Sequence, residues 1–157
     1  MDVVFSDSEL TQHQVSIADR LERIIAGRAR YSRRAWPSIG NGPAIDFAIC
    51  TRTDDLSVVI TVYQDSVQIY ANGANVIIEL IDLKDYAAWE DGASAAVAAL
   101  LKTPLRIRVR RTLVLKRQTG AIQLAYEKQN LWNGDALSCN GVGTTLTFDD
   151  WFEPSSG

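Results

Sequence analysis

The spacing of apolar residues first predicts a helix over about residues 8–29. Ser6 followed by Glu9 three positions later matches a capping box, which satisfies free amides at a helix N-terminus. The apolar positions recur with helical period and form one stripe: Leu10, Ile17, Leu21, Ile24 and Ile25. Gly27 and the arginines after it are typical of a helix C-terminus. The proline- and glycine-rich stretch 32–43 predicts a loop.

Four strands are predicted after this loop. Apolar residues alternate over 45–49, and 56–63 is apolar on both faces, as expected of a central strand. A third strand over 66–71 leads to Asn72-Gly73, a dipeptide that tolerates positive φ and favours a two-residue hairpin turn. Centred there, the hairpin pairs β-branched residues across the strands: Ile69 with Val76 and Val67 with Ile78.

A second helix is predicted to begin near Asp82 or Asp85, either of which can cap it. Its apolar residues recur on one stripe, and its many alanines would let it lie close to a sheet. The helix is expected to end near Lys102, because the residue before Pro104 disfavours helical backbone.

A long hairpin is predicted over residues 105–127, with its turn near 118–120. Two registers fit its hydrophobic pattern: in one Arg110 lies opposite Glu127, and in the other Thr112 lies opposite Glu127. From about residue 128 the chain is rich in loop-forming residues. Alternation within this segment predicts one further strand: Val142, Thr144, Leu146 and Phe148.

Together these elements predict an α+β fold in a single domain over residues 1–157. The order is a helix, a four-strand meander, a second helix, and then a long hairpin with or without a third strand. Short connections favour a mainly antiparallel sheet, with the two helices packed on one of its faces.

Charge is distributed unevenly along a chain whose net charge is only −3. Residues 20–34 hold six arginines and one acid, a local charge of +5. Residues 102–117 hold seven cations and no acid, a local charge of +7, which leaves −15 for the remainder. Such an uneven charge distribution favours either oppositely charged surfaces that neutralise each other within the protein or a binding partner selected by its charge.

The sequence LRIRVRRTLVLKRQ (105–118) places three arginines on one face of a strand: Arg106, Arg108 and Arg110. Alternate side chains on a strand lie about 7 Å apart, a step comparable to that between phosphates of a single nucleic-acid strand. The strand adds no aromatic residue to this face, although single-strand binding sites usually carry one. The alternatives are a solvated face whose cations are balanced by acids on neighbouring elements, and a contact with an acidic protein. Arg111 falls in phase with the buried positions, which indicates a bulge or an edge-strand cation.

A second basic segment follows the first helix and combines cations with aromatic residues: Arg28, Arg30, Tyr31, Arg33, Arg34 and Trp36. These residues could stack on nucleic-acid bases. Alternatively, the cations are placed near a helix C-terminus because the helix dipole favours positive charge there.

The sequence carries no catalytic signature. His13 is the only histidine, and neither Cys50 nor Cys139 has the context of a nucleophile. Asp46 and Glu79 lie within predicted strands and are expected to face solvent. Paired carboxylates are also expected to be solvated, although they leave a carboxylate-based enzyme as an alternative: Asp54-Asp55, Glu90-Asp91 and Asp149-Asp150. We therefore predict no catalytic, cofactor-binding or metal-binding residue.

The segment FDDWFE (148–153) interleaves aromatic residues with acids. Aromatic anchors rimmed by charge are the usual composition of a protein-binding hot spot. We therefore predict a partner-binding surface at five residues: Asp149, Asp150, Trp151, Phe152 and Glu153. The alternative is that Phe148 and Trp151 fill the core and the acids form its rim.

The lack of catalytic residues and the excess of acids predict a non-enzymatic partner-binding protein. The class that fits is a small bacterial immunity or inhibitor protein, which binds and neutralises a basic protein such as a nuclease toxin. One alternative is a nucleic-acid-binding domain that contacts phosphate with its arginine row, and another is a secretion chaperone or adaptor. The opening residues do not form a signal sequence, and no apolar run reaches the ~20 residues that span a bilayer. A cytoplasmic location is expected, since two isolated cysteines suit a reducing compartment.

Overall fold

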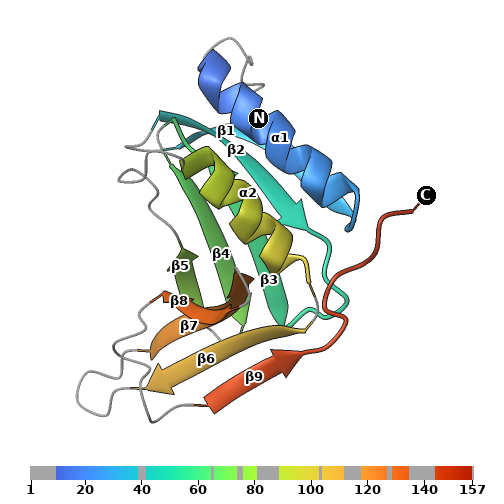
Figure 1. Cartoon of the computed structure of the whole chain (residues 1–157), viewed down its shortest axis with the longest axis vertical. Coiled ribbons are helices and arrows are strands. Elements are labelled where there is room, and N and C mark those ends of the chain that lie inside the picture. The colour runs from blue at the N-terminus through green and yellow to red at the C-terminus, as the bar shows by residue number, and fades with distance from the viewer. Residues whose placement is uncertain are drawn as a thin grey trace.

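The computed structural model describes the chain over residues 10–38, 42–64, 66–73, 76–80, 89–102, 104–111, 118–126, 129–134 and 144–156. Within these ranges the element order is a helix, five strands, a second helix and four strands. The strands form two antiparallel sheets, and the helices lie against each other and over one face of the larger sheet (Figure 1). The predicted α+β class is therefore confirmed.

The larger sheet has five strands in sequential order: β1 Tyr31–Ser38, β2 Gly42–Ile49, β3 Leu56–Val62, β4 Val67–Gly73 and β5 Val76–Leu80. The smaller sheet has the order β8-β7-β6-β9, formed by β6 Leu105–Arg111, β7 Gln118–Tyr126, β8 Gln129–Gly134 and β9 Thr144–Phe148. The last of these strands was expected, whereas β8 falls in a segment predicted to be mainly loop. The two sheets are in contact through β5 and β7.

Helix α1 spans Gln12–Ala26, which is shorter at both ends than predicted. Thr11 caps it, because its side-chain oxygen accepts a hydrogen bond of 3.1 Å from the amide of Gln14. The predicted start at residue 8 was therefore wrong, while the proposed Ser6–Glu9 box lies outside the described residues. Gly27 ends the helix and donates its amide to the carbonyl of Arg23.

Strand β1 corrects the loop predicted over residues 32–43. It pairs with β2 along its whole length, from Tyr31 opposite Ile49 to Ser38 opposite Gly42. As the edge strand of the sheet, β1 tolerates Pro37, which has no amide to donate. It also lacks the apolar alternation of a covered strand, and for that reason the sequence pattern did not reveal it.

The β4–β5 hairpin exists as predicted, but its register is different. Gly73 pairs with Val76 and Ile69 with Leu80, so Ile69 lies opposite a residue four positions beyond the predicted one. A shift of four keeps every residue on the same face of the sheet, because side chains alternate with a period of two. Hydrophobic alternation alone therefore fits both registers.

The β6–β7 hairpin is also paired differently from either predicted register. Arg110 lies opposite Thr119, and Arg106 lies opposite Gln123. Residues 118–120, which were predicted to form the turn, are the start of β7. β6 continues in unbroken register to Arg111, which excludes a bulge there, and it lies inside the sheet between β7 and β9, so it is not an edge strand.

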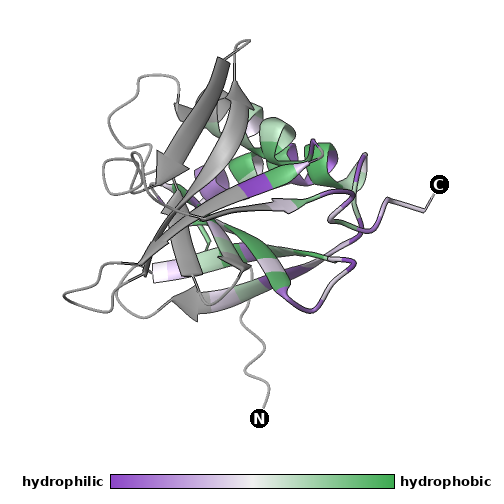
Figure 2. Cartoon of the chain, turned by 90° about the horizontal axis from the view of Figure 1, so that it is seen from below, coloured by the Kyte–Doolittle hydropathy of each residue, from purple (hydrophilic) through white to green (hydrophobic). Residues whose placement is uncertain are grey.

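The hydrophobic core lies between the helices and the five-stranded sheet. Helix α2 spans Trp89–Leu100 and packs against α1 and β7; its predicted caps lie outside the described residues. Hydrophobic residues cover much of α2 and of the central strands (Figure 2). The largest side chains that are almost fully buried are Trp151, Phe47, Leu21, Ile25, Ile45, Ile60, Ile69, Leu100 and Leu105. The presence of Trp151 in this set shows that the end of the chain completes the core.

Candidate functional site

Residues 149–156 form a C-terminal segment that lies between the end of α1 and the turn joining β2 to β3. Its backbone is hydrogen-bonded on both sides. Phe152 forms an isolated antiparallel β-bridge with Thr51, and Pro154 forms another with Ala29. Four hydrogen bonds of 2.8–3.1 Å fasten it: Arg52 N–H to Trp151 O, Glu153 N–H to Cys50 O, Arg30 N–H to Glu153 O, and Ser155 N–H to Arg28 O. The segment therefore continues the sheet where β1 and β2 separate.

Two aromatic residues anchor this segment. Trp151 is only 1% exposed, and its ring meets that of Phe152 edge to face at a centroid distance of 4.9 Å. Phe152 is half-buried and packs against the core. Trp151 is thus a core residue, in agreement with the alternative interpretation that the aromatic residues of FDDWFE fill the core. The segment offers its acids to solvent and keeps its largest aromatic side chain inside.

Asp149 and Asp150 are exposed on the surface of this segment. The β2–β3 turn contributes two more exposed acids, Asp54 and Asp55, from a loop that is hydrogen-bonded to the segment. We call Asp54, Asp55, Asp149 and Asp150 the acidic surface. Asp150 has a φ of 50°, a left-handed backbone conformation that aspartate adopts more readily than most residues.

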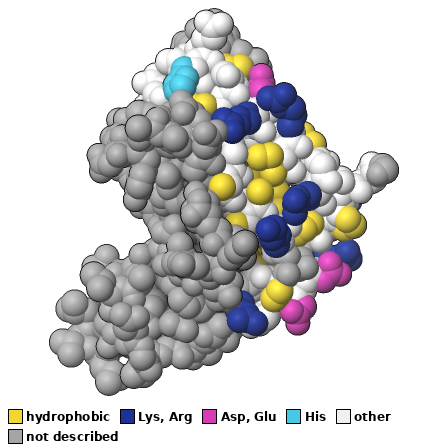
Figure 3. Space-filling model, in the orientation of Figure 1, with side chains coloured by type: hydrophobic (Ala, Val, Ile, Leu, Met, Phe, Trp, Pro, Cys, Tyr) yellow, Lys and Arg dark blue, Asp and Glu magenta, His cyan; other side chains and the backbone are white. Residues whose placement is uncertain are grey.

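Two arginines partly balance these acids. The Nε of Arg52 lies 3.5 Å from the Asp150 carboxylate, and the Nη1 of Arg30 lies 2.7 Å from that of Glu153. Acidic and basic side chains lie side by side at this end of the molecule (Figure 3). Exposed pairs of this kind contribute about 0–1 kcal/mol to stability, so they leave the acids available to a stronger partner.

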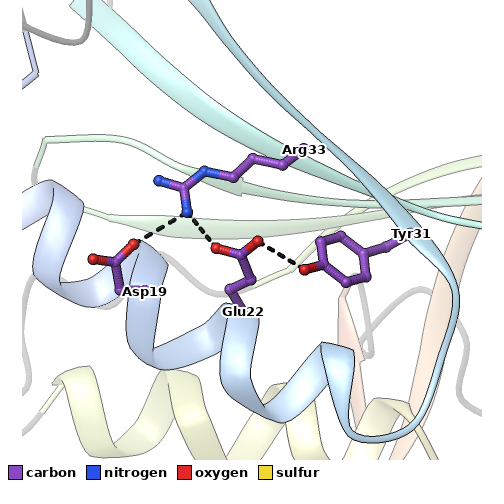
Figure 4. A network of polar contacts seen from close by, with 4 residues as sticks. All are labelled: Asp19, Glu22, Tyr31 and Arg33. Atoms are coloured by element: carbon purple, nitrogen blue, oxygen red, sulfur yellow. Dashed lines mark hydrogen bonds and ion pairs between the residues drawn. The ribbon is translucent and has the colours of Figure 1, made fainter. Parts of the chain in front are cut away.

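A polar network joins α1 to β1 (Figure 4). Arg33 binds the carboxylates of Asp19 and Glu22, and its guanidinium lies 5.7 Å from the centre of the Phe47 ring. The Tyr31 hydroxyl donates a 2.7 Å hydrogen bond to Glu22, which raises the pKa of that tyrosine, and burial adds to the effect. Arg33 and Tyr31 of the basic segment thus serve to hold the helix on the sheet.

A row of polar residues crosses the opposite face of the larger sheet, one from each of β1 to β4. In register these are Arg34, Asp46, Thr61 and Gln68. Asp46 is half-buried and accepts a 2.6 Å hydrogen bond from the Thr61 hydroxyl and another from the side chain of Trp36. Burial raises the pKa of Asp46, and these bonds oppose the rise.

The position of Asp46 corrects the expectation that it faces open solvent. Strand alternation placed it correctly on the face away from Phe47. The sequence did not reveal its cross-strand neighbours, which cover it. The arrangement supplies one carboxyl of raised pKa, with no second acid, histidine or cysteine bonded to it in the described part of the chain. It therefore lacks the paired groups of hydrolytic catalysis.

The structure also contains a buried polar contact that sequence reasoning missed. The side-chain amide of Gln14 is fully buried and donates to the carbonyls of Pro43 and Val62, at 2.7 and 2.9 Å. His13, its neighbour, is exposed. Among the described residues, no three histidine, cysteine or acidic side chains gather closely enough to hold a metal ion.

Arg106 lies on the exposed surface of β6, and positions 108 and 110 share its face by strand alternation. Within their described bounds, the four strands of this sheet contain no aspartate or glutamate, so any acid that balances these arginines lies on another part of the chain.

Comparison of the chain with protein-family models, with curated proteins and with solved structures finds no match. No helix within the described ranges is both long and apolar enough to cross a membrane.

Proposed function

We propose that this protein is a non-enzymatic binding protein of the inhibitor or immunity type, which neutralises a basic protein such as a nuclease toxin. The observation that carries this proposal is the display of Asp149 and Asp150 on a segment fixed to the sheet on both sides. Asp54 and Asp55 extend the same acidic surface.

Rigidity favours binding at this surface. A segment held by four backbone hydrogen bonds and by buried Trp151 loses little conformational freedom when a partner docks. The left-handed backbone at Asp150 fixes the direction in which the chain presents its two acids. Such preorganisation lets a small interface contribute more of its contact energy to affinity.

The charge of the surface would act mainly on association. Acids on an exposed rim steer a cationic partner during diffusion and disfavour acidic competitors. The weak pairs with Arg52 and Arg30 can exchange for bonds to a partner's cations. A partner rich in lysine or arginine is therefore the occupant that fits this end of the molecule.

The test is affinity capture from lysate of the native host, with nuclease treatment, using two variants that change the net charge by the same amount. One is Asp149→Asn with Asp150→Asn. The matched control is Ser16→Lys with Ser32→Lys, at exposed positions on α1 and β1. We expect the wild type and the control to retain a basic protein, identified by mass, and the acidic-surface variant to retain at least ten-fold less.

The captured protein is then assayed with and without the wild-type chain, which should suppress its activity. Equal retention by all three proteins would contradict the role of the acidic surface. Retention of acidic proteins, or of unfolded segments without selectivity for charge, would contradict the inhibitor function and favour a chaperone.

A further inference from the structure

The larger sheet ends at β1, which pairs with β2 alone within the described part of the chain. The amide of Cys50 donates to the carbonyl of Arg30 at 2.9 Å, and this pair continues the β1–β2 register. In an antiparallel pair, hydrogen-bonded and non-hydrogen-bonded residues alternate. Even-numbered residues of β1 therefore bond to β2, whereas Tyr31, Arg33 and Ala35 direct their backbone amides and carbonyls towards the outer edge.

This outer edge is short and accessible. Pro37 is at the next outward-facing position, where its missing amide costs no bond to β2. Ser32, Arg33, Arg34 and Trp36 are all exposed, so the edge can be reached from both faces of the sheet. An accessible sheet edge can accept an extended segment of another chain as an added strand, held by backbone hydrogen bonds.

On the face away from α1, the edge carries Arg34 and Trp36, two positions apart. Trp36 is 40% exposed and is the only large hydrophobic side chain exposed among the described residues. Its side chain donates a hydrogen bond to Asp46, which restrains the orientation of the ring. The charge of Arg34 also acts on Asp46, and a guanidinium has enough donors for a second carboxylate, as Arg33 shows on the other face. Tryptophan and arginine are the residue types enriched in binding hot spots.

On the face that carries Arg33, a groove of about 720 Å³ runs along α1. Its lining includes Asp19 and Glu22, the two acids that bind Arg33 (Figure 4). The groove therefore lies on the side of α1 next to β1, and Val15 and Ala26 add apolar surface to it. Because side chains of a strand alternate between faces, a strand added to β1 would direct every second side chain towards this groove.

We infer that the outer edge of β1 binds an extended segment of another protein, which adds a strand to the sheet and places an acidic residue opposite Arg34 and an apolar residue opposite Trp36. In an antiparallel addition these two contacts are non-hydrogen-bonded pairs, in which side chains approach most closely. The segment that fits therefore carries an acidic and an apolar residue two positions apart.

Charge disfavours a second copy of this chain at the same edge. Antiparallel pairing of two β1 strands would bring Arg33 and Arg34 of one copy close to those of the other, and like charges across a strand pair are destabilising. Charged residues and proline are also the means by which sheet edges avoid self-association. The inferred site is separate from the acidic surface and does not depend on the proposed function.

The probe is a displayed library of random linear dodecapeptides, selected for binding to the wild-type chain. We expect the enriched peptides to share an acidic residue two positions from an aliphatic or aromatic one. Anisotropy of one fluorescein-labelled enriched peptide then compares the wild type with Arg34→Glu and Trp36→Ala. The matched control is Arg28→Glu, which makes the same change of charge at an exposed position after α1.

We expect Arg34→Glu and Trp36→Ala each to weaken binding at least ten-fold, and the control less than three-fold. A second peptide has lysine in place of the acidic residue. It should bind Arg34→Glu at least five-fold more tightly than it binds the wild type, because the reversed charges again attract. Such a rescue would not follow from a loss of folding.

Amide hydrogen exchange of the wild-type chain, followed by NMR, gives a readout that requires no variant. In the free protein the amides of Tyr31, Arg33 and Ala35 should exchange faster than those of the even-numbered residues of β1, which bond to β2. The enriched peptide should slow exchange at these three amides at least ten-fold. This pattern is specific to an added strand, since docking through side chains alone leaves the edge amides without new acceptors.

Three results would overturn the inference: no enriched peptide with the expected spacing, equal losses of affinity in the β1 variants and the control, or unchanged exchange at the three edge amides when the peptide binds. Slow exchange at these amides in the free protein would also contradict it. If light scattering then showed a dimer, the edge would be assigned to a second copy of the chain.

Discussion

Arg30 and Glu153, 123 residues apart in sequence, are joined twice. The amide of Arg30 donates to the carbonyl of Glu153 at 2.8 Å, and its guanidinium binds the Glu153 carboxylate at 2.7 Å. The backbone bond belongs to the row that fixes residues 149–156, whereas the side-chain pair is exposed. The two contacts should therefore differ in their effect on stability.

Trp151→Ala should lower the free energy of unfolding by about 3–5 kcal/mol, because it leaves a large cavity in the core. Glu153→Gln should lower it by less than about 1 kcal/mol, since it removes only an exposed ion pair and retains the backbone bonds. Urea denaturation followed by circular dichroism measures both values. A loss for Trp151→Ala no larger than that for Glu153→Gln would show that the segment is not part of the cooperative core.

Gln14→Leu should destabilise the protein by about 1–3 kcal/mol although it inserts an apolar residue into a buried position. The reason is that Gln14 donates to two carbonyls, those of Pro43 and Val62, which the leucine would leave without this donor. Ala18→Gly, at an equally buried position one turn further along α1, is a control for helix propensity, with an expected cost of about 1 kcal/mol. Unchanged stability of Gln14→Leu would mean that both carbonyls find other donors.

Gly42 and Gly27 form a matched pair for a test of backbone strain. Gly42 has a φ of +74°, and a Cβ there would lie 3.4 Å from the Gln64 side chain. Gly42→Ala should cost about 1–2 kcal/mol, because a left-handed backbone is unfavourable for alanine. Gly27 has a φ of −71°, so Gly27→Ala should be neutral or stabilise by up to about 1 kcal/mol. Thermal unfolding of both variants distinguishes strain from a general intolerance of alanine.

Sequence alone was sufficient for elements whose pattern is set by burial. The apolar alternation of Phe47 with its neighbours, and the apolar run at 56–63, identify β2 and β3 because both strands face the core. Strand β1 escaped prediction because it is an edge strand, and its inward Arg33 is stabilised by Asp19 and Glu22 rather than by apolar contact. The two acids that balance the charge of Arg33 lie on α1, so the sequence of β1 itself contains no pattern that indicates a strand.

Register and site geometry could not be read from periodicity for a different reason. The observed partner of Arg110 is Thr119, eight positions from the predicted Glu127, and any even shift preserves the two faces of a hairpin. The partial burial of Asp46 could not be predicted for the same reason: its hydrogen-bond donors, Thr61 and Trp36, lie on neighbouring strands, and periodicity does not determine how those strands pair.

Asp46 provides a test through pH. Burial raises its pKa above the ordinary value of 3.8, while bonds from Thr61 and Trp36 and the charge of Arg34 oppose the rise. The folded chain thus holds this proton to a higher pH than the unfolded chain does. Ionisation of Asp46 consequently opposes folding: the penalty is absent below the unfolded-state pKa and develops as pH rises through the folded-state pKa.

Asp46→Asn removes this charge and keeps an acceptor oxygen for Thr61 and Trp36. We expect the variant to be more stable than the wild type at neutral pH, with a difference that closes as pH falls towards 3.8. Urea denaturation of both proteins at a series of pH values measures this difference. Thr61→Val is the internal control: it removes a bond that lowers the pKa, so its own loss of stability should be greatest where Asp46 is ionised. A wild type that gains stability over Asp46→Asn as pH rises would show that Asp46 is held as a stabilised carboxylate.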